Sequence, residues 1–393
     1  MKKLFLQIGF RGRLALYGTT LFLVGMSAAT LGPTLPSLAI NTNTTLGTIS
    51  LLFVLRSFAR LMGVTSAGFL YDRLSGHLIF VGGLISVALA MFQTGNAQTF
   101  LILGMTFLLL GFAEGVLDTG GTTLVVWSKK GKLGATLPIL YFMYGAGSFV
   151  APLVIAQIIS FGWEPTFAYW ILPLLVIVPI PLLLILPSPE KQHGNKQKSD
   201  DSSNEQPYIL LMTLLCLIAL YVGIEASFSG WIFSYGTISG IATEVEAAYL
   251  TSTYWAMLSL GRLLMIPIAE RVQPQRILMV AIIIVILCAI AISLSATALL
   301  LGLSTAVFGL FMSPIFPTIM TIAAENLNMS AKVTSWFFMS TGIAAMILPW
   351  VMGQFIEEVG ISAVTLGTLG LVIVMGILYI PLRYRLVRLS PLD

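Results

Sequence analysis

The lysines and arginines of this chain are confined to every second polar segment between its long apolar stretches. They precede the first apolar stretch and follow each even-numbered one, whereas the intervening segments have none. Only three of the 20 basic residues lie inside apolar stretches, namely Arg56, Arg60 and Arg262. Because Lys and Arg mark the cytoplasmic loops of membrane proteins, this alternation predicts an even number of membrane crossings with both termini in the cytoplasm.

The apolar stretches predict an all-α membrane protein with twelve transmembrane helices in two six-helix halves. Each stretch can cross about 30 Å of hydrocarbon as a helix, and a helix satisfies its own backbone groups in lipid. The predicted spans are 14–40, 45–71, 78–94, 99–127, 135–159, 167–187, 208–236, 247–269, 276–295, 299–324, 333–356 and 362–382.

Composition is consistent with this prediction. The apolar residue types make up 57% of the chain and the charged types 9%, which excludes an ordinary soluble domain. The net charge of +4 comes from the basic loops, so it indicates contact with anionic lipid of the inner leaflet and not nucleic acid binding. We expect a monomer in the plasma (inner) membrane.

One strongly polar stretch divides the chain. Residues 188–206 contain Lys, Asp, Ser, Asn and Gln with almost no apolar residue, a composition that cannot form a packed core. We interpret them as a cytoplasmic linker between an N-terminal six-helix bundle, 1–187, and a C-terminal six-helix bundle, 207–393.

The two halves look like a duplication. Arg60 within the second span is followed by the acid–arginine pair Asp72-Arg73, and Arg262 within the eighth span is followed by an acid–arginine pair at 270–271. About one helical turn is deleted between the two elements in the second copy. Parallel repeats of this kind are typical of one transporter architecture, in which the substrate site lies near the midplane between the halves.

The cytoplasmic end of the second span resembles the signature of the major facilitator superfamily. Residues 68–77 read GFLYDRLSGH, with a Gly, an Asp-Arg pair and a second Gly, although the second Gly is one place late and His77 stands where a basic pair is expected. The resemblance implies alternating access, with Asp72 and Arg73 as gating or structural charges.

Three further segments resemble the fucose–galactose–glucose symporter family, especially its sodium-dependent glucose transporter branch. They are 115–121 (GVLDTGG), 141–152 (YFMYGAGSFVAP) and 221–235 (YVGIEASFSGWIFSY). This resemblance implies a small-molecule substrate, a hexose or related sugar, carried together with Na+ or H+. In that family an acid at the place of Asp118 is tied to sugar binding and cation coupling, and Thr122 replaces a frequent Asn.

Two acids lie deep in the fourth span. Glu114 and Asp118 are four residues apart and therefore share a helix face. An ionisable group at that depth is costly and faces a cavity or a partner. The corresponding segment of the tenth span, 309–316, has no acid, which favours a coupling role over a folding role, with a structural charge pair as the alternative.

The arginines inside the spans predict charge pairs. Arg56 and Arg60 are also four residues apart. Counted from the outer ends of their helices, Arg60 and Glu114 lie at similar depth, so we predict that they pair in a structural or gating role. Arg262 pairs either with Glu225 or with no group that the sequence identifies.

Aromatic residues supply candidate substrate contacts. Tyr141 and Tyr144 share a face of the fifth span; a phenol suits a sugar, but it serves helix packing equally well. Glu225 is the acid deep in the seventh span. Gly230 beside Trp231 predicts a helix break that lines a cavity, where Trp231 could stack on a sugar.

Several functions are excluded or disfavoured by missing residues. The sequence has no phosphate-binding loop of the Walker type, and its two histidines, His77 and His193, fall in predicted cytoplasmic loops. We expect no enzymatic activity, no cofactor and no metal site. In the resembled family the fucose:proton symporter branch carries an acid in the first span, whereas this span offers only Ser27 and Thr30. This difference weakens proton symport and leaves sodium coupling or facilitated diffusion open.

Two other functions share the predicted architecture. One is a proton-coupled exporter of amphipathic small molecules, since fold does not determine substrate. The other is a non-transporting membrane receptor or scaffold, which the acids inside the spans count against.

Overall fold

A computed structural model describes residues 9–128, 136–191 and 208–389 of the chain, and over these residues every regular element is a helix. The chain divides into two compact units, Met1–Gly194 and Asn195–Asp393. The boundary falls within the interpreted linker, most of which, 192–207, lies outside the described residues.

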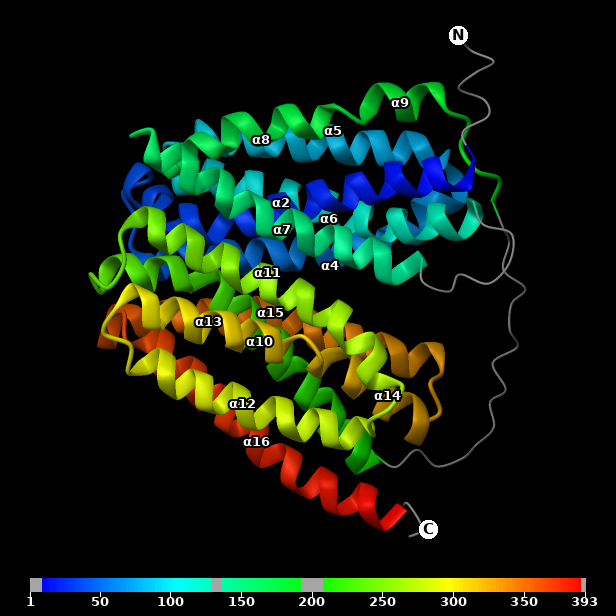
Figure 1. The fold of residues 1–393 in the computed structure, drawn as a ribbon. Helices are drawn as coiled ribbons and strands as arrows, with labels where there is room; N and C mark the ends of the chain where they lie inside the picture. Colours follow the sequence, from blue (N-terminus) through cyan, green and yellow to red (C-terminus); the bar gives the residue numbers. More distant parts are fainter. Residues whose placement is uncertain (1–8, 129–135, 192–207, 390–393) are drawn as a thin grey trace. The chain divides into compact units, whose positions relative to one another are not determined.

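The first unit contains eight α-helices and one short 3-10 helix among its described residues (Figure 1). They are α2 (Phe10–Asn41), α3 (Leu46–Ile49), α4 (Leu51–Arg73), α5 (Gly76–Gly95), α6 (Phe100–Ser128), α7 (Thr136–Ser160), η1 (Pro165–Phe167), α8 (Ala168–Ile177) and α9 (Ile180–Ile185). Within this unit, α4 packs along α6, and α2 packs along α7.

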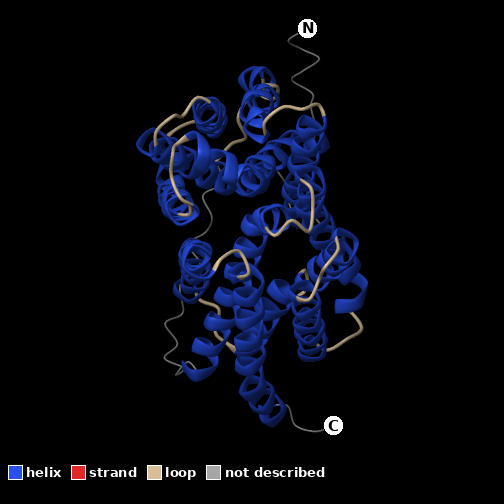
Figure 2. Cartoon of the chain, turned by 90° about the vertical axis from the view of Figure 1, so that its left-hand side faces the viewer, coloured by secondary structure: helices blue, strands red, loops and turns tan. Residues whose placement is uncertain are grey.

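The second unit is built in the same way, with helices and connecting loops and no strand in its described part (Figure 2). Its helices are α10 (Tyr208–Ile238), α11 (Glu244–Ala269), α12 (Pro274–Ser293), α13 (Ala298–Met312), α14 (Ile315–Asn326), α15 (Ala331–Val359) and α16 (Ala363–Leu389). Here α10 packs along α15, and α11 packs along α13.

The described helices confirm the predicted spans. Eleven continuous or briefly interrupted helical segments are long and apolar enough to cross a membrane. Helix α11 is the twelfth and is more polar at its N-terminal end, where Thr243 and Glu246 form a capping box. The chain is therefore an all-α membrane protein with twelve transmembrane spans.

Two of the spans are interrupted at a proline, and none is interrupted at Gly230. The sixth span is divided between α8 and α9 at Pro179, and the tenth between α13 and α14 at Pro314, where a missing N–H and ring sterics disturb the helix. The predicted break at Gly230 is wrong, because α10 continues unbroken from Tyr208 to Ile238. A glycine alone lowers helix propensity, and tertiary packing overrides that preference.

Close backbone contact through glycine sets how α4 lies on α6. A Cβ atom added to Gly111 would lie 2.1 Å from the carbonyl oxygen of Arg56, and one added to Gly115 would lie 2.3 Å from the carbonyl oxygen of Arg60. Small residues four apart allow such an approach in membrane helices. These two contacts fix both the separation and the register of the two helices.

Candidate functional site

The most extensively bonded charges in the first unit are those of Arg56 on α4 and Glu114 on α6. Arg56 Nη2 lies 2.5 Å from Glu114 Oε1, and Arg56 Nε lies 2.9 Å from Oε2. The Ser27 hydroxyl on α2 donates to the same carboxylate at 2.7 Å, and Arg56 Nη1 donates to the Ala28 carbonyl at 3.1 Å. Glu114 is completely buried, so this network compensates the cost of removing both charges from water.

A second pair lies one helical turn further along both helices. The Arg60 guanidinium forms a salt bridge with Asp118 and donates a hydrogen bond to its carboxylate. The side chains remain 36% and 23% exposed, respectively. The Arg60 guanidinium carbon also lies 5.8 Å from the ring centroid of Tyr144 on α7, within cation–π range. This pair is therefore less completely bonded and more accessible than the first.

The predicted pair between Arg60 and Glu114 is wrong by one helical turn. The partners are Arg56 with Glu114 and Arg60 with Asp118, and both pairs are separated by 58 positions. The glycine contacts explain the register, because Gly111 lies against Arg56 and Gly115 lies against Arg60. Depth counted from predicted helix ends is uncertain by about one turn, which is the size of the error.

Not all the predicted contacts on α6 and α7 join this cluster. Tyr144 lies beside Arg60, whereas Tyr141 is 56% exposed on the same helix. The Thr122 hydroxyl donates to the backbone carbonyl of Asp118 at 3.3 Å, an interaction within α6. Ser148 is buried and donates to the Gly25 carbonyl at 3.1 Å, so it joins α7 to α2.

In the second unit Arg262 pairs with Glu225, which is one of the two alternatives predicted for Arg262. Arg262 Nη2 on α11 lies 3.8 Å from Glu225 Oε2 on α10, a distance that suits an ion pair but is too long for a hydrogen bond. The hydroxyl of Tyr221, one turn before Glu225, donates to the same carboxylate oxygen. Both charged side chains are partly exposed.

Trp231 does not belong to this cluster. Its side chain is completely buried, and its indole N–H donates to the Pro349 carbonyl on α15 at 2.9 Å. An enclosed ring cannot present a face to a sugar. We therefore assign Trp231 to the packing of α10 against α15 and do not keep it among the candidate substrate contacts.

The C-terminal end of α4 and the start of α5 correct one expectation. His77 is the second residue of α5 and is buried, not part of a loop. Its ring bonds the Tyr17 hydroxyl at 2.7 Å and the Leu186 carbonyl at 3.0 Å, which replaces contact with water. Nearby, the Arg73 guanidinium lies 3.9 Å from the Phe69 ring, and Lys191 donates to the Asp72 carbonyl at 2.6 Å.

Sequence reasoning missed the role of Ser27 and of the two glycines on α6. Ser27 is a common small residue of an apolar span, so nothing local indicates that it bonds Glu114. The glycines did carry a signal, because residues 111–115 read GFAEG, a spacing typical of close helix contacts.

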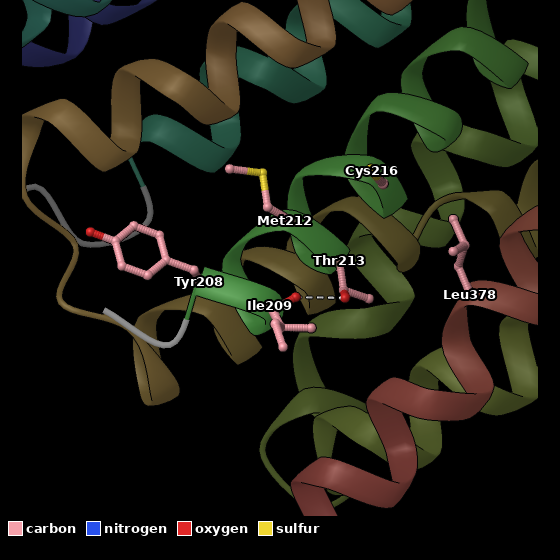
Figure 3. A pocket seen from close by; sticks show the side chains of 6 residues that line it. All are labelled: Tyr208, Ile209, Met212, Thr213, Cys216 and Leu378. Atoms are coloured by element: carbon pink, nitrogen blue, oxygen red, sulfur yellow. Dashed lines mark hydrogen bonds between the residues drawn. The ribbon is translucent and has the colours of Figure 1, made fainter. Parts of the chain in front are cut away.

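A shallow groove on the second unit contains none of these charges (Figure 3). It lies at the start of α10, next to Leu378 of α16. Its lining residues are Tyr208, Ile209, Met212, Thr213, Cys216 and Leu378. The Thr213 hydroxyl donates to the Ile209 carbonyl at 2.7 Å, so the groove presents an almost entirely apolar surface.

Twelve spans and charge pairs inside them define an integral membrane protein of the transporter type. Residues 18–349 match the Major Facilitator Superfamily, and the chain belongs to this family. Its fold matches the nucleoside transporter NupG with a TM-score of 0.75 at 16% identity, covering 94% of this chain and 98% of that one. It also matches a bacterial homolog of the human lysosomal transporter Spinster, with a TM-score of 0.78 at 12% identity and coverages of 93% and 95%.

Curated relatives extend over nearly the whole chain. The mouse (Mus musculus) sodium-dependent glucose transporter 1A is 26% identical, with 93% of this chain and 95% of that protein covered. The human (Homo sapiens) sodium-dependent glucose transporter 1 is also 26% identical, with coverages of 94% and 78%. The human major facilitator superfamily domain-containing protein 4A is 20% identical, with coverages of 88% and 86%.

Proposed function

We propose that this protein is a secondary active transporter that takes up a hexose or related sugar, driven by a cation gradient through alternating access. The similarity to sodium-dependent glucose transporters supports this substrate class and makes Na+ the favoured driving ion. The plasma membrane, across which a sodium gradient exists, is the location we propose, with both termini in the cytoplasm.

The observation that carries the proposal is the contrast between the two stacked charge pairs. Glu114 accepts from Arg56 through both oxygens and also from Ser27, and it is completely buried. Asp118 accepts a hydrogen bond from one arginine, Arg60, and both side chains are partly exposed. The Arg56–Glu114 pair therefore stays intact, whereas in the second pair another cation can replace Arg60 at Asp118.

We infer that the coupling cation competes with Arg60 for the carboxylate of Asp118. A cation at Asp118 replaces the positive charge of Arg60, and the released guanidinium has the Tyr144 ring within reach, 5.8 Å from its central carbon. When the cation leaves, Arg60 returns and neutralises Asp118. The Asp118 carboxylate is thus paired with a positive charge both with and without the bound cation. This pairing offsets the free-energy cost of a charge inside the membrane.

In this mechanism Tyr144 also serves the sugar. A phenol covers the apolar C–H face of a sugar ring, and its hydroxyl bonds the sugar hydroxyls. Because Tyr144 lies beside Arg60, binding of the sugar and of the cation affect the same side chains. This arrangement couples the two ligands without a long-range relay.

The test is uptake of a panel of labelled sugars into proteoliposomes, with sodium and proton gradients imposed separately. The proposal expects one hexose or related sugar to accumulate above its external concentration when sodium is high outside. Equal uptake with and without either gradient would reduce the proposal to facilitated diffusion. Absence of uptake for every sugar, together with proton-driven export of amphipathic compounds, would replace it with the exporter.

A further inference from the structure

The residues that follow the last helix of the first unit return to the corner between α4 and α5. Helix α4 ends at Arg73 and α5 begins at Gly76, so two residues join them. Residues 186–191, which follow α9 and which we name the strap, bond this corner at three points. Within the strap Leu186 and Pro189 are buried, so the strap packs on the first unit as part of its fold.

One attachment is the buried ring of His77, the second residue of α5. Its Nδ1 lies 3.0 Å from the Leu186 carbonyl oxygen, and its Nε2 lies 2.7 Å from the Tyr17 hydroxyl on α2. Because a carbonyl oxygen only accepts, Nδ1–H donates to it, and Nε2 of the neutral ring accepts from the Tyr17 hydroxyl. One side chain thus joins the strap, α5 and α2.

The other two attachments cap the helix ends at the corner. The His77 backbone N–H, one of the first donors of α5, donates to the Ser188 hydroxyl oxygen at 3.3 Å. Ser75, which precedes α5, makes no side-chain cap bond to the described residues. At the end of α4 the Lys191 ammonium donates to the Asp72 carbonyl at 2.6 Å, where a positive charge also suits the helix dipole. The strap therefore caps both helices of the corner.

The second unit offers a comparison, because its helix contacts repeat those of the first at a constant shift of 198 positions. A Cβ atom on Gly63 would lie 2.2 Å from the Phe112 carbonyl oxygen, and one on Gly261 would lie 2.7 Å from the Leu310 carbonyl oxygen. Both residues of the second contact are numbered 198 higher than those of the first. The start of α5 therefore corresponds to the start of α12.

The second unit ties this equivalent junction with a residue inside a helix. Gln275 corresponds to His77, and its carbonyl accepts from the Tyr379 hydroxyl at 2.6 Å. Tyr379 lies within α16, several residues before its end at Leu389. In the first unit the tie instead uses the Leu186 carbonyl, at the end of α9, and the residues that follow it. The first unit thus connects this junction to the predicted linker.

We propose that residues 186–191 are a docking strap through which the linker controls the α4–α5 corner, and that His77 is its anchor. While the strap is docked, both helix ends are capped and the corner that carries Asp72 and Arg73 is held in place. When the strap undocks, His77 and both helix ends lose these partners together, so a pull on the linker releases the corner. This inference goes beyond the proposed function, because it requires neither a sugar nor a cation.

Limited trypsin digestion of the purified protein in lipid tests the anchor. Trypsin cuts after Lys191 only when the residues around that bond leave the corner, so the cleavage rate follows the undocked population when redocking is fast. His77→Gln removes the Nδ1–H donor and should raise this rate about fivefold, the effect of one hydrogen bond. His77→Asn places an amide N–H near the position of Nδ1–H and should keep a rate close to that of the wild type.

Cleavage after Lys196 in the same digests is the internal reference and should be equal in all variants. A wild-type rate after Lys191 in His77→Gln would overturn the proposal, as would an equal increase after Lys196, which indicates general destabilisation. The same increase in His77→Asn as in His77→Gln would contradict the role of the Nδ1–H donor.

A second variant keeps the test valid if His77→Gln fails to fold. Ser188→Ala removes the hydroxyl that caps α5 and should raise cleavage after Lys191 about fivefold, the usual effect of losing a serine cap. Ser330→Ala is the matched control, because the Ser330 hydroxyl accepts from the Val333 N–H at the start of α15, also at 3.3 Å. It should leave cleavage after Lys191 unchanged. An equal effect in both variants, or none in Ser188→Ala, would contradict the strap.

Discussion

Arg56 binds both carboxylate oxygens of Glu114, at 2.5 and 2.9 Å, in a pair to which Ser27 adds a third hydrogen bond. Three helices, α2, α4 and α6, meet at this buried group. The pair one turn away, Arg60 with Asp118, has the same chemistry but is partly exposed. We propose that the buried pair serves stability and the partly exposed pair serves ion exchange, on adjacent turns of the same two helices.

The buried pair should dominate stability. Arg56→Ala leaves Glu114 buried without its cation, and we expect a loss of about 3–5 kcal/mol in unfolding free energy. Adding Glu114→Gln should recover part of that loss, because a missing pair costs less than a lone buried charge. Thermal unfolding in detergent measures this. Additive losses in the double variant would argue against a direct pair.

The exchangeable pair should affect ion binding more than stability. Arg60→Ala removes the competitor for Asp118, so the sodium concentration for half-maximal sugar binding should fall about two- to fivefold, as expected for a partly exposed salt bridge. The thermal unfolding temperature should change less than in Arg56→Ala. Unchanged sodium dependence in a folded Arg60→Ala protein would show that Arg60 does not compete with the cation.

The glycine contacts should be sensitive to one methyl group. Gly111→Ala places a Cβ atom 2.1 Å from the Arg56 carbonyl oxygen, which must push α4 from α6 and cost about 1–3 kcal/mol, the usual range for overpacking. Gly82→Ala on α5 is the matched control, because nothing lies within 4 Å of an added Cβ there. Comparable unfolding temperatures for both variants would contradict the close contact.

The alternating basic loops predict which segments face the cytoplasm. In a background without Cys216 and Cys288, a cysteine at position 196 should resist impermeant labelling of intact cells. A cysteine at position 244, the first residue of α11, should react. Labelling of position 196 from outside the cell would contradict the predicted topology.

The fold was predictable because its constraints are local. Apolar length and the distribution of basic residues determine spans such as Gly76–Gly95 and Pro274–Ser293, and a helix in lipid needs no distant partner for its backbone. The partners within the site were not predictable to better than one turn. Whether Arg60 faces Glu114 or Asp118 depends on the register of α4 on α6, which is set by glycine contacts far apart in the sequence.

The sequence also does not predict which individual polar aromatic side chains are buried. From the residues next to them in the sequence, Trp231 is predicted to line a cavity and His77 to lie in a loop. Their actual partners, the carbonyl groups of Pro349 and Leu186, are 118 and 109 positions away. A polar aromatic side chain can be buried wherever such a partner occurs, and no local pattern indicates that partner.

The central claim, that Asp118 couples the cation to sugar movement, is tested most directly with Asp118→Asn. This variant keeps the shape of the side chain and removes its charge. Sodium-driven uptake of labelled sugar and counterflow at equal gradients are measured in the same proteoliposomes. We predict that accumulation above the external concentration is lost while counterflow survives, because alternating access itself requires no net ion movement. Accumulation at the wild-type level in the Asn variant would contradict the coupling role and leave Asp118 as a structural partner of Arg60.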